Sequence, residues 1–555
     1  MKYKCAFFLL AFFLGSSDHV YSQAAAFHRY IIEFKDKKDS PFSTSDPSAF
    51  LSQRSIDRRI SYAIPVTEND LPINPDYIQQ VMNAGVKVLN RSKWLNSISI
   101  ETDDSVALVA VKSLPFVKTS YPIAPRFSNT HRPPKTVVDF IPQKLSEDGL
   151  ELYGKASSQI DMLRGNALHA QGYRGEGMVI AVLDAGFFNT PNLAVFDSLF
   201  EQGRVLGWWN FVHGNDTVFV SGGHGTSVLS TIAANMPGTM VGTAPGASVY
   251  LFVTEDGASE YPIEEHNWAA GAERADSLGA DMISSSLGYS RFDDSGFNHT
   301  YAQMDGNTTM VTRAADYAAS KGMIVCSSAG NEGNSDWFYI TAPADADSIL
   351  TVGAIDSVGL ITSFSSNGPS ADGDVKPNVV AQGIRATVVE PFSGTIVSSN
   401  GTSFSNPIIA GMTACLWQAH PDKNNMEIIS AIEKSSSLYF NPNDSMGYGI
   451  PNYEVADLIL SDKAPDNLAL TEPLIYPNPF DSQFGILYYT ARFQEVQVEM
   501  FNLMGEKIQS FNTTLQIGYN YLPVKAFEHA PKGLYFLRLI FDDHEEVVRA
   551  MKAAD

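Results

Sequence analysis

The sequence predicts an α/β central domain, in which a parallel sheet is covered by helices on both faces. An α+β domain precedes it, and an all-β, sandwich-like domain follows. Two observations predict the central domain: its strands are uninterrupted apolar runs, such as 178–183, and helices such as 266–278 separate them. Strands that are apolar on both faces are typical of parallel sheets buried between helices. A chain of 555 residues also exceeds what one hydrophobic core organises.

The chain begins with an export signal, the segment 1–23. Lys2 and Lys4 precede the apolar run Ala6–Leu14, and signal cleavage is expected near Ser22-Gln23-Ala24. This run is too short to span a bilayer, and no other run is long enough. We therefore expect an exported protein without a transmembrane segment.

The composition excludes some functions. The 38 basic and 61 acidic residues give a net charge of −23, and no Lys/Arg run stands out, so no nucleic-acid binding is expected. Cys5 leaves with the signal, so the mature chain keeps only Cys326 and Cys415. Both lie in apolar surroundings and are expected to be core residues rather than parts of a disulfide framework.

Residues 24–150 are expected to form an α+β domain. Its predicted elements are strand 30–34, helix 75–84, strands 86–89 and 98–101, helix 104–114 and strand 117–121. The first helix opens with a proline and stops at Gly85, as helices commonly do. The order β-α-β-β-α-β is a known small motif. We find no catalytic constellation in it.

The central domain is expected over residues 151–460. Its clearest strands are 178–183, 281–285 and 323–327, and its clearest helices are 266–278 and 311–320. In a parallel α/β sheet, functional residues collect beyond the carboxyl ends of the strands. Asp184 and Asn331 both fall just after such ends.

The C-terminal region is expected to be a separate domain. Residues 461–473 have little apolar content and predict a linker. Residues 474–555 contain short strands at 484–489, 495–502 and 533–541, with a turn at 502–506. This is an all-β pattern.

The segment Asn400–Pro407 predicts a turn that runs into a helix. Its apolar residues recur every four positions and mark one buried face: Phe404, Ile408, Met412 and Leu416. We expect Pro407 in the first turn, where a missing N–H costs little. Ser403 then lies near the helix N-terminus, whose N–H groups would stabilise an oxyanion. Taken alone, such a segment is most often a plain Ser/Thr N-cap.

Two other segments supply what a serine nucleophile needs. A hydroxyl needs a general base, and the best base is a histidine that a carboxylate orients. Asp184 follows a buried strand, and His224 opens a helix after two glycines. The chain order Asp, His, Ser is one of three in which such triads occur. The sequence therefore predicts Asp184, His224 and Ser403 as a catalytic triad.

In these segments the sequence resembles the subtilisin-like serine proteases (subtilases), over most of residues 155–455. The matching segments, in the family's order, are Val182-Leu183-Asp184-Ala185-Gly186, His224-Gly225-Thr226-Ser227, Ser286-Leu287-Gly288, Ala329-Gly330-Asn331-Glu332-Gly333, Phe364-Ser365-Ser366-Asn367-Gly368-Pro369 and Gly401-Thr402-Ser403. The resemblance implies a subtilisin-like fold and a serine endopeptidase.

The resemblance also implies residue roles. Ser403 would attack the scissile carbonyl, His224 would take and return the proton, and Asp184 would orient His224. Asn331 would donate its side-chain amide to the oxyanion, beside the Ser403 backbone N–H. Two segments would wall the primary specificity pocket: Ser286-Leu287-Gly288 and Ser328-Ala329-Gly330. Without the resemblance, Asn331 would be interpreted as a turn residue between glycines. Each of the two wall segments would be interpreted as a strand end closed by a glycine.

The chain departs from the family pattern without losing a triad or oxyanion group. Asp-Ala-Gly at 184–186 replaces Asp-Thr-Gly or Asp-Ser-Gly, and His-Gly-Thr-Ser at 224–227 replaces His-Gly-Thr-His. After Ser403, Phe404-Ser405 replaces Met-Ala, and Ile408-Ile409 replaces His-Val. These changes bear on pocket shape and rate.

An acidic stretch lies between the predicted strands. It comprises Glu255, Asp256, Glu260, Glu264 and Glu265. It could bind calcium, as many relatives do at other loops, but we expect a solvated charged face. No other metal or cofactor is predicted.

The flanking domains also carry resemblances. Residues 24–150 resemble the inhibitory pro-segment of subtilases, which assists folding and occupies the cleft until it is cleaved. The C-terminal domain resembles the sorting domain of Bacteroidota-type (type IX) secretion at 476–479, 502–506 and 533–538. This implies the type IX secretion machinery as a partner and export through the periplasm to the surface or medium. The alternative is a small β-sandwich that binds protein or carbohydrate.

The leading hypothesis is a secreted serine endopeptidase made as an inactive precursor and acting on proteins or peptides. Two alternatives remain: a non-catalytic surface-binding protein on the same fold, and a transpeptidase or esterase that uses the same triad. The intact Asp184, His224, Asn331 and Ser403 argue against the first. The pocket floor cannot be located in the sequence, so the preferred substrate side chain stays open.

Overall fold

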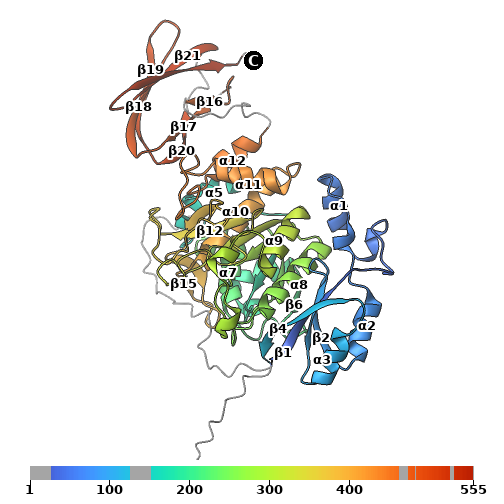
Figure 1. Ribbon diagram of the computed structural model, residues 1–555. Helices are drawn as coiled ribbons and strands as arrows, with labels where there is room; N and C mark the ends of the chain where they lie inside the picture. The colour runs from blue at the N-terminus through green and yellow to red at the C-terminus, as the bar shows by residue number, and fades with distance from the viewer. Residues whose placement is uncertain (1–26, 126–151, 462–472, 482, 525–530, 554–555) are drawn as a thin grey trace, which may run out of the picture.

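The computed structural model describes residues 27–125, 152–461, 473–481, 483–524 and 531–553 (Figure 1). The predicted signal peptide and most of the predicted linker lie outside these ranges. Within them, no helix combines the length and apolar character that crossing a membrane requires. The N-terminal domain lies beside the central one, and the C-terminal strands lie at the far end from it (Figure 1).

The N-terminal domain has the predicted β-α-β-β-α-β order. Its elements are β1 (Phe27–Phe34), α2 (Pro75–Asn83), β2 (Lys87–Ser92), β3 (Ser97–Glu101), α3 (Ser105–Lys112) and β4 (Val117–Pro125). The strands form an antiparallel sheet in the order β2-β3-β1-β4. The sequence did not predict the arm between β1 and α2, which holds η1 (Pro47–Ala49), α1 (Gln53–Ser61) and η2 (Glu68–Asp70).

The central domain is built on a seven-stranded sheet in the order β13-β12-β11-β10-β5-β9-β6. Every neighbouring pair is parallel. The strands are β5 (Val179–Asp184), β6 (Val205–Asn210), β9 (Ser248–Val253), β10 (Met282–Ser285), β11 (Ile324–Ser328), β12 (Leu350–Ile355) and β13 (Val379–Gln382). This confirms the predicted parallel α/β class.

Helices cover both faces of this sheet. Alternate residues of each strand point to opposite faces, so each strand contributes to two cores. Ile180 and Val182 of β5 enter a core with α7 (His224–Ala233), α10 (Thr402–Ala419), α11 (Asn425–Lys434) and α12 (Tyr453–Leu460). Ala181 and Leu183 enter a second core beneath α8 (Ile263–Leu278) and α9 (Met310–Ser320). The shorter elements are α4 (Ser157–Asp161), α5 (Gly165–Ala170), η3 (Thr190–Asn192), η4 (Ala194–Phe196), α6 (Asp197–Glu201), β7 (Asn235–Met236), β8 (Met240–Val241), η5 (Ser295–Phe297), η6 (Tyr301–Gln303), β14 (Ala386–Val389) and β15 (Ile396–Ser399).

The C-terminal domain is all β, as predicted. Its strands are β16 (Leu474–Tyr476), β17 (Phe484–Thr490), β18 (Gln494–Phe501), β19 (Lys507–Leu515), β20 (Gly518–Val524), β21 (Gly533–Ile540) and β22 (Glu545–Lys552). They form two antiparallel sheets, β16-β17-β20 and β19-β18-β21-β22. Apolar residues of both sheets share one core, which is the arrangement of a sandwich.

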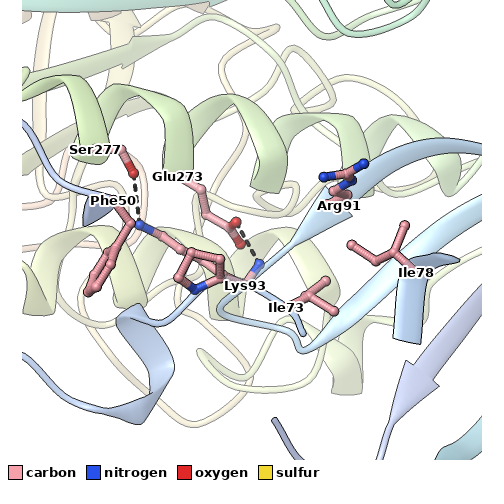
Figure 2. A pocket seen from close by; sticks show the side chains of 8 residues that line it. Phe50, Ile73, Ile78, Arg91, Lys93, Glu273 and Ser277 are labelled. Atoms are coloured by element: carbon pink, nitrogen blue, oxygen red, sulfur yellow. Dashed lines mark hydrogen bonds between the residues drawn. The ribbon is translucent and has the colours of Figure 1, made fainter. Parts of the chain in front are cut away.

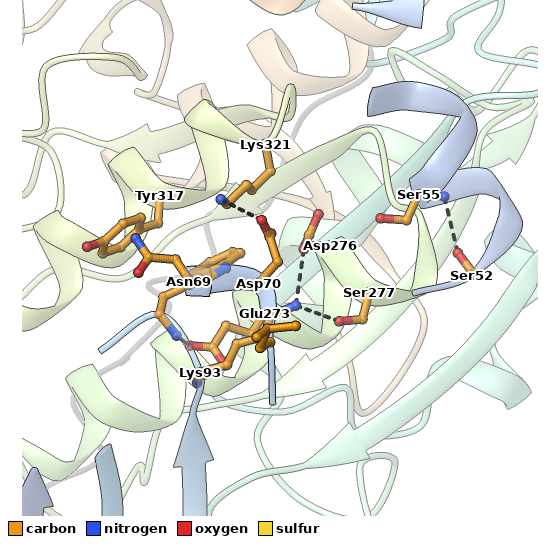
Figure 3. A network of polar contacts seen from close by, with 12 residues as sticks. Ser52, Ser55, Asn69, Asp70, Lys93, Glu273, Asp276, Ser277, Tyr317 and Lys321 are labelled. Atoms are coloured by element: carbon orange, nitrogen blue, oxygen red, sulfur yellow. Dashed lines mark hydrogen bonds and ion pairs between the residues drawn. The ribbon is translucent and has the colours of Figure 1, made fainter. Parts of the chain in front are cut away.

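A buried ion cluster joins the N-terminal domain to the central one (Figure 3). Asp276 of α8 accepts from Arg58 at 2.7 Å and from Arg59 at 3.0 Å, both on α1, and from Lys93 at 3.3 Å. Arg59 also pairs with Asp70 at 3.0 Å. All of these side chains are buried, so removing one partner would leave uncompensated charge, at a cost of about 3–5 kcal/mol.

Glu273, one turn before Asp276, binds the same edge of the N-terminal domain. Its carboxylate accepts from the Ser92 hydroxyl at 2.5 Å and from the backbone N–H groups of Lys93 and Trp94 at 2.7 and 3.0 Å. A cavity of about 180 Å³ lies next to it, between both domains (Figure 2). Its lining residues are Phe50, Pro72, Ile73, Ile78, Arg91, Lys93, Glu273 and Ser277, so it belongs to the domain interface.

Candidate active site

Asp184 and His224 form a hydrogen-bonded pair. Asp184 is the last residue of β5, and His224 is the first residue of α7. The imidazole Nδ1 lies 2.8 Å from Asp184 Oδ1 and 3.0 Å from Oδ2. A carboxylate only accepts, so Nδ1 carries the proton, and Nε2 of the neutral ring is free to act as a base. Both residues are buried, at 0% and 5% exposed.

Ser403 is the second residue of α10, as the sequence predicts. The apolar face behind it is buried, with Phe404 at 2% exposed. The ring of Phe404 lies 6.0 Å, centroid to centroid, from the His224 ring, which places the starts of α7 and α10 side by side. Among the hydrogen bonds of the described residues, none joins His224 to Ser403. Catalytic hydrogen bonds often form only with substrate bound.

Ser286 contacts Ser403 from the end of β10. The Ser286 hydroxyl donates to the Ser403 backbone carbonyl at 2.8 Å, and Ser403 Oγ donates to the Ser286 carbonyl at 3.4 Å. The expectation that Pro407 lies in the first turn is wrong, since it is the sixth residue of α10. Its missing N–H would have bonded to the Ser403 carbonyl four residues earlier. That carbonyl is therefore free to accept from Ser286.

Asn331 is held by the start of α10. Its Oδ1 accepts from the Thr402 N–H at 2.9 Å and from the Thr402 hydroxyl at 3.0 Å. A backbone N–H can only donate, so the facing atom is the oxygen, and the amide NH₂ points away from Thr402. A Cβ built on Gly401, whose φ is +146°, would lie 3.7 Å from both Asn331 Nδ2 and the Ser403 N. The Asn331 side-chain amide and the Ser403 N–H therefore both lie beside Gly401.

The electrostatic surroundings favour the charged form of His224. Burial by itself would lower the pKa of His224, but the Asp184 carboxylate more than offsets this, and Glu255 adds to its effect. The pKa of His224 is therefore raised above its ordinary value. Such a shift makes the imidazole a stronger base towards a serine hydroxyl. Sequence reasoning missed the contribution of Glu255, because 31 positions separate it from His224.

The acidic stretch is not the solvated face that we expected. Glu255, Glu260, Glu264 and Glu265 are all buried, at 9% exposed or less. Backbone amides explain part of this burial, since Glu264 accepts from the N–H groups of Asp256 and Tyr261 at 2.9 and 3.2 Å. Oxygens of Glu255, Glu260 and Glu264 lie within 4.8 Å of one another, which fits the all-oxygen ligand preference of calcium. Calcium binding, the alternative to the solvated face, is untested.

The two predicted pocket walls leave neighbouring strands. Ser286, Leu287 and Gly288 follow β10, and Ser328, Ala329 and Gly330 close and follow β11. β10 and β11 are paired in parallel, with Ser285 opposite Ser327. The walls therefore start side by side at the carboxyl edge of the sheet, and Ser286 of the first wall contacts Ser403. Sequence reasoning missed Thr402 as the partner of Asn331, although it lies within the segment that predicted Ser403.

Comparison with known proteins identifies the class of protein as a serine protease. The Subtilase family model matches residues 175–449, the model of the Bacteroidota peptidase S8 propeptide domain matches residues 29–136, and that of the secretion system C-terminal sorting domain matches residues 474–552. Subtilisin E of Bacillus subtilis (strain 168) is 32% identical to this chain over 301 residues. The match covers 54% of this chain and 70% of the subtilisin E chain. The chain belongs to the subtilase family.

Other known proteins match a comparable share of this chain. A subtilisin of Bacillus pumilus is 31% identical over 301 residues, covering 54% of this chain and 97% of its own. Among solved structures, MycP1 of Mycobacterium smegmatis is 22% identical, with a TM-score of 0.43, covering 60% of this chain and 90% of that chain.

The flanking domains agree with the predictions for them. The N-terminal domain is a propeptide domain of the Bacteroidota peptidase S8 type, and the C-terminal domain is a type IX secretion sorting domain. The sorting domain indicates export to the cell surface or the medium. The residue boundaries of the domains stay predictions.

Proposed function

We propose that this protein is a secreted serine endopeptidase that hydrolyses peptide bonds through an acyl-enzyme on Ser403. The observation that carries the proposal is the buried Asp184–His224 pair, whose Nδ1 hydrogen bond of 2.8 Å leaves Nε2 free beside the start of α10. His224 would take the proton of Ser403 as the hydroxyl attacks the substrate carbonyl. It would then return that proton to the leaving amine.

The oxyanion of the tetrahedral intermediate would be held by two donors, the Asn331 side-chain amide and the Ser403 N–H. Both flank one point beside Gly401, at 3.7 Å from a Cβ built there. The Thr402 contacts fix the Asn331 side chain before substrate arrives. Donors that are already oriented stabilise the developing charge without a cost of reorganisation, and one such donor is worth roughly 10²–10³ in kcat.

The chain would be made as an inactive precursor. The propeptide domain is clamped to α8 by the Asp276 cluster, and its last strand, β4, delivers Ile123 and Ala124 onto Tyr261 and Ile263 at the start of α8. Glu255, which acts on His224, precedes Tyr261 by six residues (261 − 255). The last strand of the propeptide domain therefore packs against the segment that follows Glu255, which is the arrangement we propose for the uncleaved precursor.

Peptide hydrolysis tests the proposal. Ser403→Ala in the full chain should abolish turnover of a mixed peptide library and leave thermal unfolding unchanged. Ser405→Ala is the matched control, since this buried hydroxyl only bonds to the Thr402 carbonyl at 3.1 Å. Full activity of Ser403→Ala would refute the proposal. Product analysis with a competing amine separates hydrolysis from transpeptidation, and an ester substrate tests for esterase activity.

A further inference from the structure

The space between the two predicted pocket walls has a different residue at each end. At one end lies Ser403, whose carbonyl accepts from Ser286 at 2.8 Å. At the other end, Ala342 pairs with Tyr289, which directly follows the first wall. The backbone N–H of Tyr289 donates to the Ala342 carbonyl at 2.8 Å, and the backbone N–H of Ala342 donates to the Tyr289 carbonyl at 3.1 Å. The residue before Ala342 is Thr341, and it lies against the second wall, donating its N–H to the Ala329 carbonyl at 3.2 Å.

The side chain of Thr341 occupies the space between the two walls. A Cβ built on Gly288 would overlap with Thr341 Oγ1 and lie 3.2 Å from Thr341 Cβ. A Cβ built on Gly330, whose φ is +107°, would lie 2.9 Å from Thr341 Oγ1 and 3.2 Å from its Cγ2. The threonine therefore packs directly on the Cα atoms of the last glycine of each wall. These glycines give the space that the threonine fills.

The hydroxyl of Thr341 is a buried polar group without a protein partner. Thr341 is 4% exposed, and its Oγ1 has no hydrogen-bond partner among the described residues. A buried hydroxyl without a hydrogen bond costs free energy that a ligand could recover. The unpartnered hydroxyl lies between Gly288 and Gly330, the last residues of the two walls.

We propose that Thr341 forms the floor of the primary specificity pocket and restricts the residue before the scissile bond to small side chains, such as alanine and serine. This inference rests on the proposed function. The Thr341 side chain would fill the depth that an aromatic or long aliphatic side chain needs. A serine hydroxyl would also meet the unpartnered Thr341 Oγ1. Because one methylene in a tight pocket is worth roughly 10–200-fold in kcat/KM, a phenylalanine should be disfavoured by about 100-fold or more.

The test compares two peptide substrates that differ only in alanine or phenylalanine before the scissile bond. The wild-type full chain, after maturation, should prefer alanine by about 100-fold in kcat/KM. Thr341→Gly should raise the phenylalanine-to-alanine ratio by at least about 10-fold. Thr341→Val keeps the volume and loses the hydroxyl, so it should keep the wild-type ratio. Thr341→Ala applies the same test if the glycine variant unfolds at a lower temperature.

Three results would overturn the inference: a wild-type enzyme that prefers phenylalanine, glycine and alanine variants with an unchanged ratio, or a valine variant that behaves like glycine. In each case Ser403 still reacts, so the proposed function survives. A wild-type protein that cleaves neither peptide and does not label at Ser403 with a fluorophosphonate refutes the proposed function, and this inference with it.

Discussion

Two buried carboxylates of the central domain face very different partners. Asp184 at the active site hydrogen bonds to one imidazole, that of His224, at 2.8 Å. Asp276 at the propeptide interface meets three basic side chains, those of Arg58, Arg59 and Lys93, within 3.3 Å. Both carboxylates are fully buried. The partners, and not the burial, therefore decide what each carboxylate does.

The pKa of Asp276 is lowered at the propeptide interface, whereas the pKa of His224 is raised at the active site. Burial alone would raise the pKa of Asp276, but Lys93, Arg59 and Arg58 more than offset it and hold that pKa well below the ordinary value. The carboxylate is thus charged at every physiological pH, as a clamp requires. At the active site, Asp184 instead raises the pKa of His224, a group that can gain and lose a proton near neutral pH.

Removing the charge of Asp184 should have the largest effect. Asp184→Asn replaces the acceptor-only carboxylate with an amide that can also donate, so the His224 tautomer is no longer fixed and kcat should fall by about 10⁴-fold. Steady-state peptide hydrolysis measures this. Asp276→Asn in the mature enzyme is the matched control, because once the propeptide domain has left, that carboxylate has no role in the reaction. Equal losses in both variants would contradict the division of roles.

Removing the charge of Asp276 should act on the precursor instead. Asp276→Asn leaves three buried cations short of a counter-charge, so the free energy of unfolding should fall by about 3–5 kcal/mol. Urea unfolding of the uncleaved Ser403→Ala chain measures it. Asp57→Asn, on the exposed face of α1, is the control and should change stability by less than about 0.5 kcal/mol. A loss no larger than that of the control would show that the cluster does not clamp the domains.

The two regions should also respond to pH in different ranges. A lowered carboxylate pKa contributes stability above its unfolded value, so the Asp276 contribution should persist at neutral pH and be lost only as acid protonates it. A raised histidine pKa contributes stability below the unfolded value of about 6.5 and loses it as pH rises through the folded pKa. Unfolding of the Ser403→Ala chain at several pH values measures both, and the slope near neutral pH should become smaller in His224→Ala, while His299, whose pKa is also raised, keeps its own contribution.

The smallest expected effect concerns Glu255. Catalysis needs neutral His224, so kcat/KM should fall as the pH drops through the raised pKa of His224. The acidic limb of the plot of kcat/KM against pH should therefore lie above pH 6.5. Glu255→Gln removes a negative charge that favours the imidazolium, and the limb should move to lower pH. A limb that stays in place would mean that solvent screens Glu255 from the ring.

The sequence predicted the parallel sheet because its strands are continuous apolar runs, and it predicted Asp184, His224, Asn331 and Ser403 because each lies in a recognisable segment. It did not predict the arm that holds Arg58 and Arg59. A helix with two arginines in sequence has the pattern of a solvated element, and only the distant Asp70 and Asp276 make their burial tolerable.

The same limit explains the acidic stretch and the pocket floor. Glu264 is buried because it caps backbone N–H groups of its own loop, which a count of charges does not reveal. Thr341 lies at the pocket because its backbone bonds to Ala329, and its neighbour Ala342 to Tyr289, two contacts between distant segments. Pro407 was misplaced because the sequence pattern does not show where the helix begins.

The rate at which a fluorophosphonate labels Ser403 tests the central claim most directly, because it reports the reactivity of one hydroxyl without any substrate preference. In the mature protein, mass spectrometry should place the label on Ser403, and His224→Ala should slow labelling by about 10³-fold or more. A His224→Ala protein that labels at the wild-type rate would contradict the claim that Asp184, His224 and Ser403 act together.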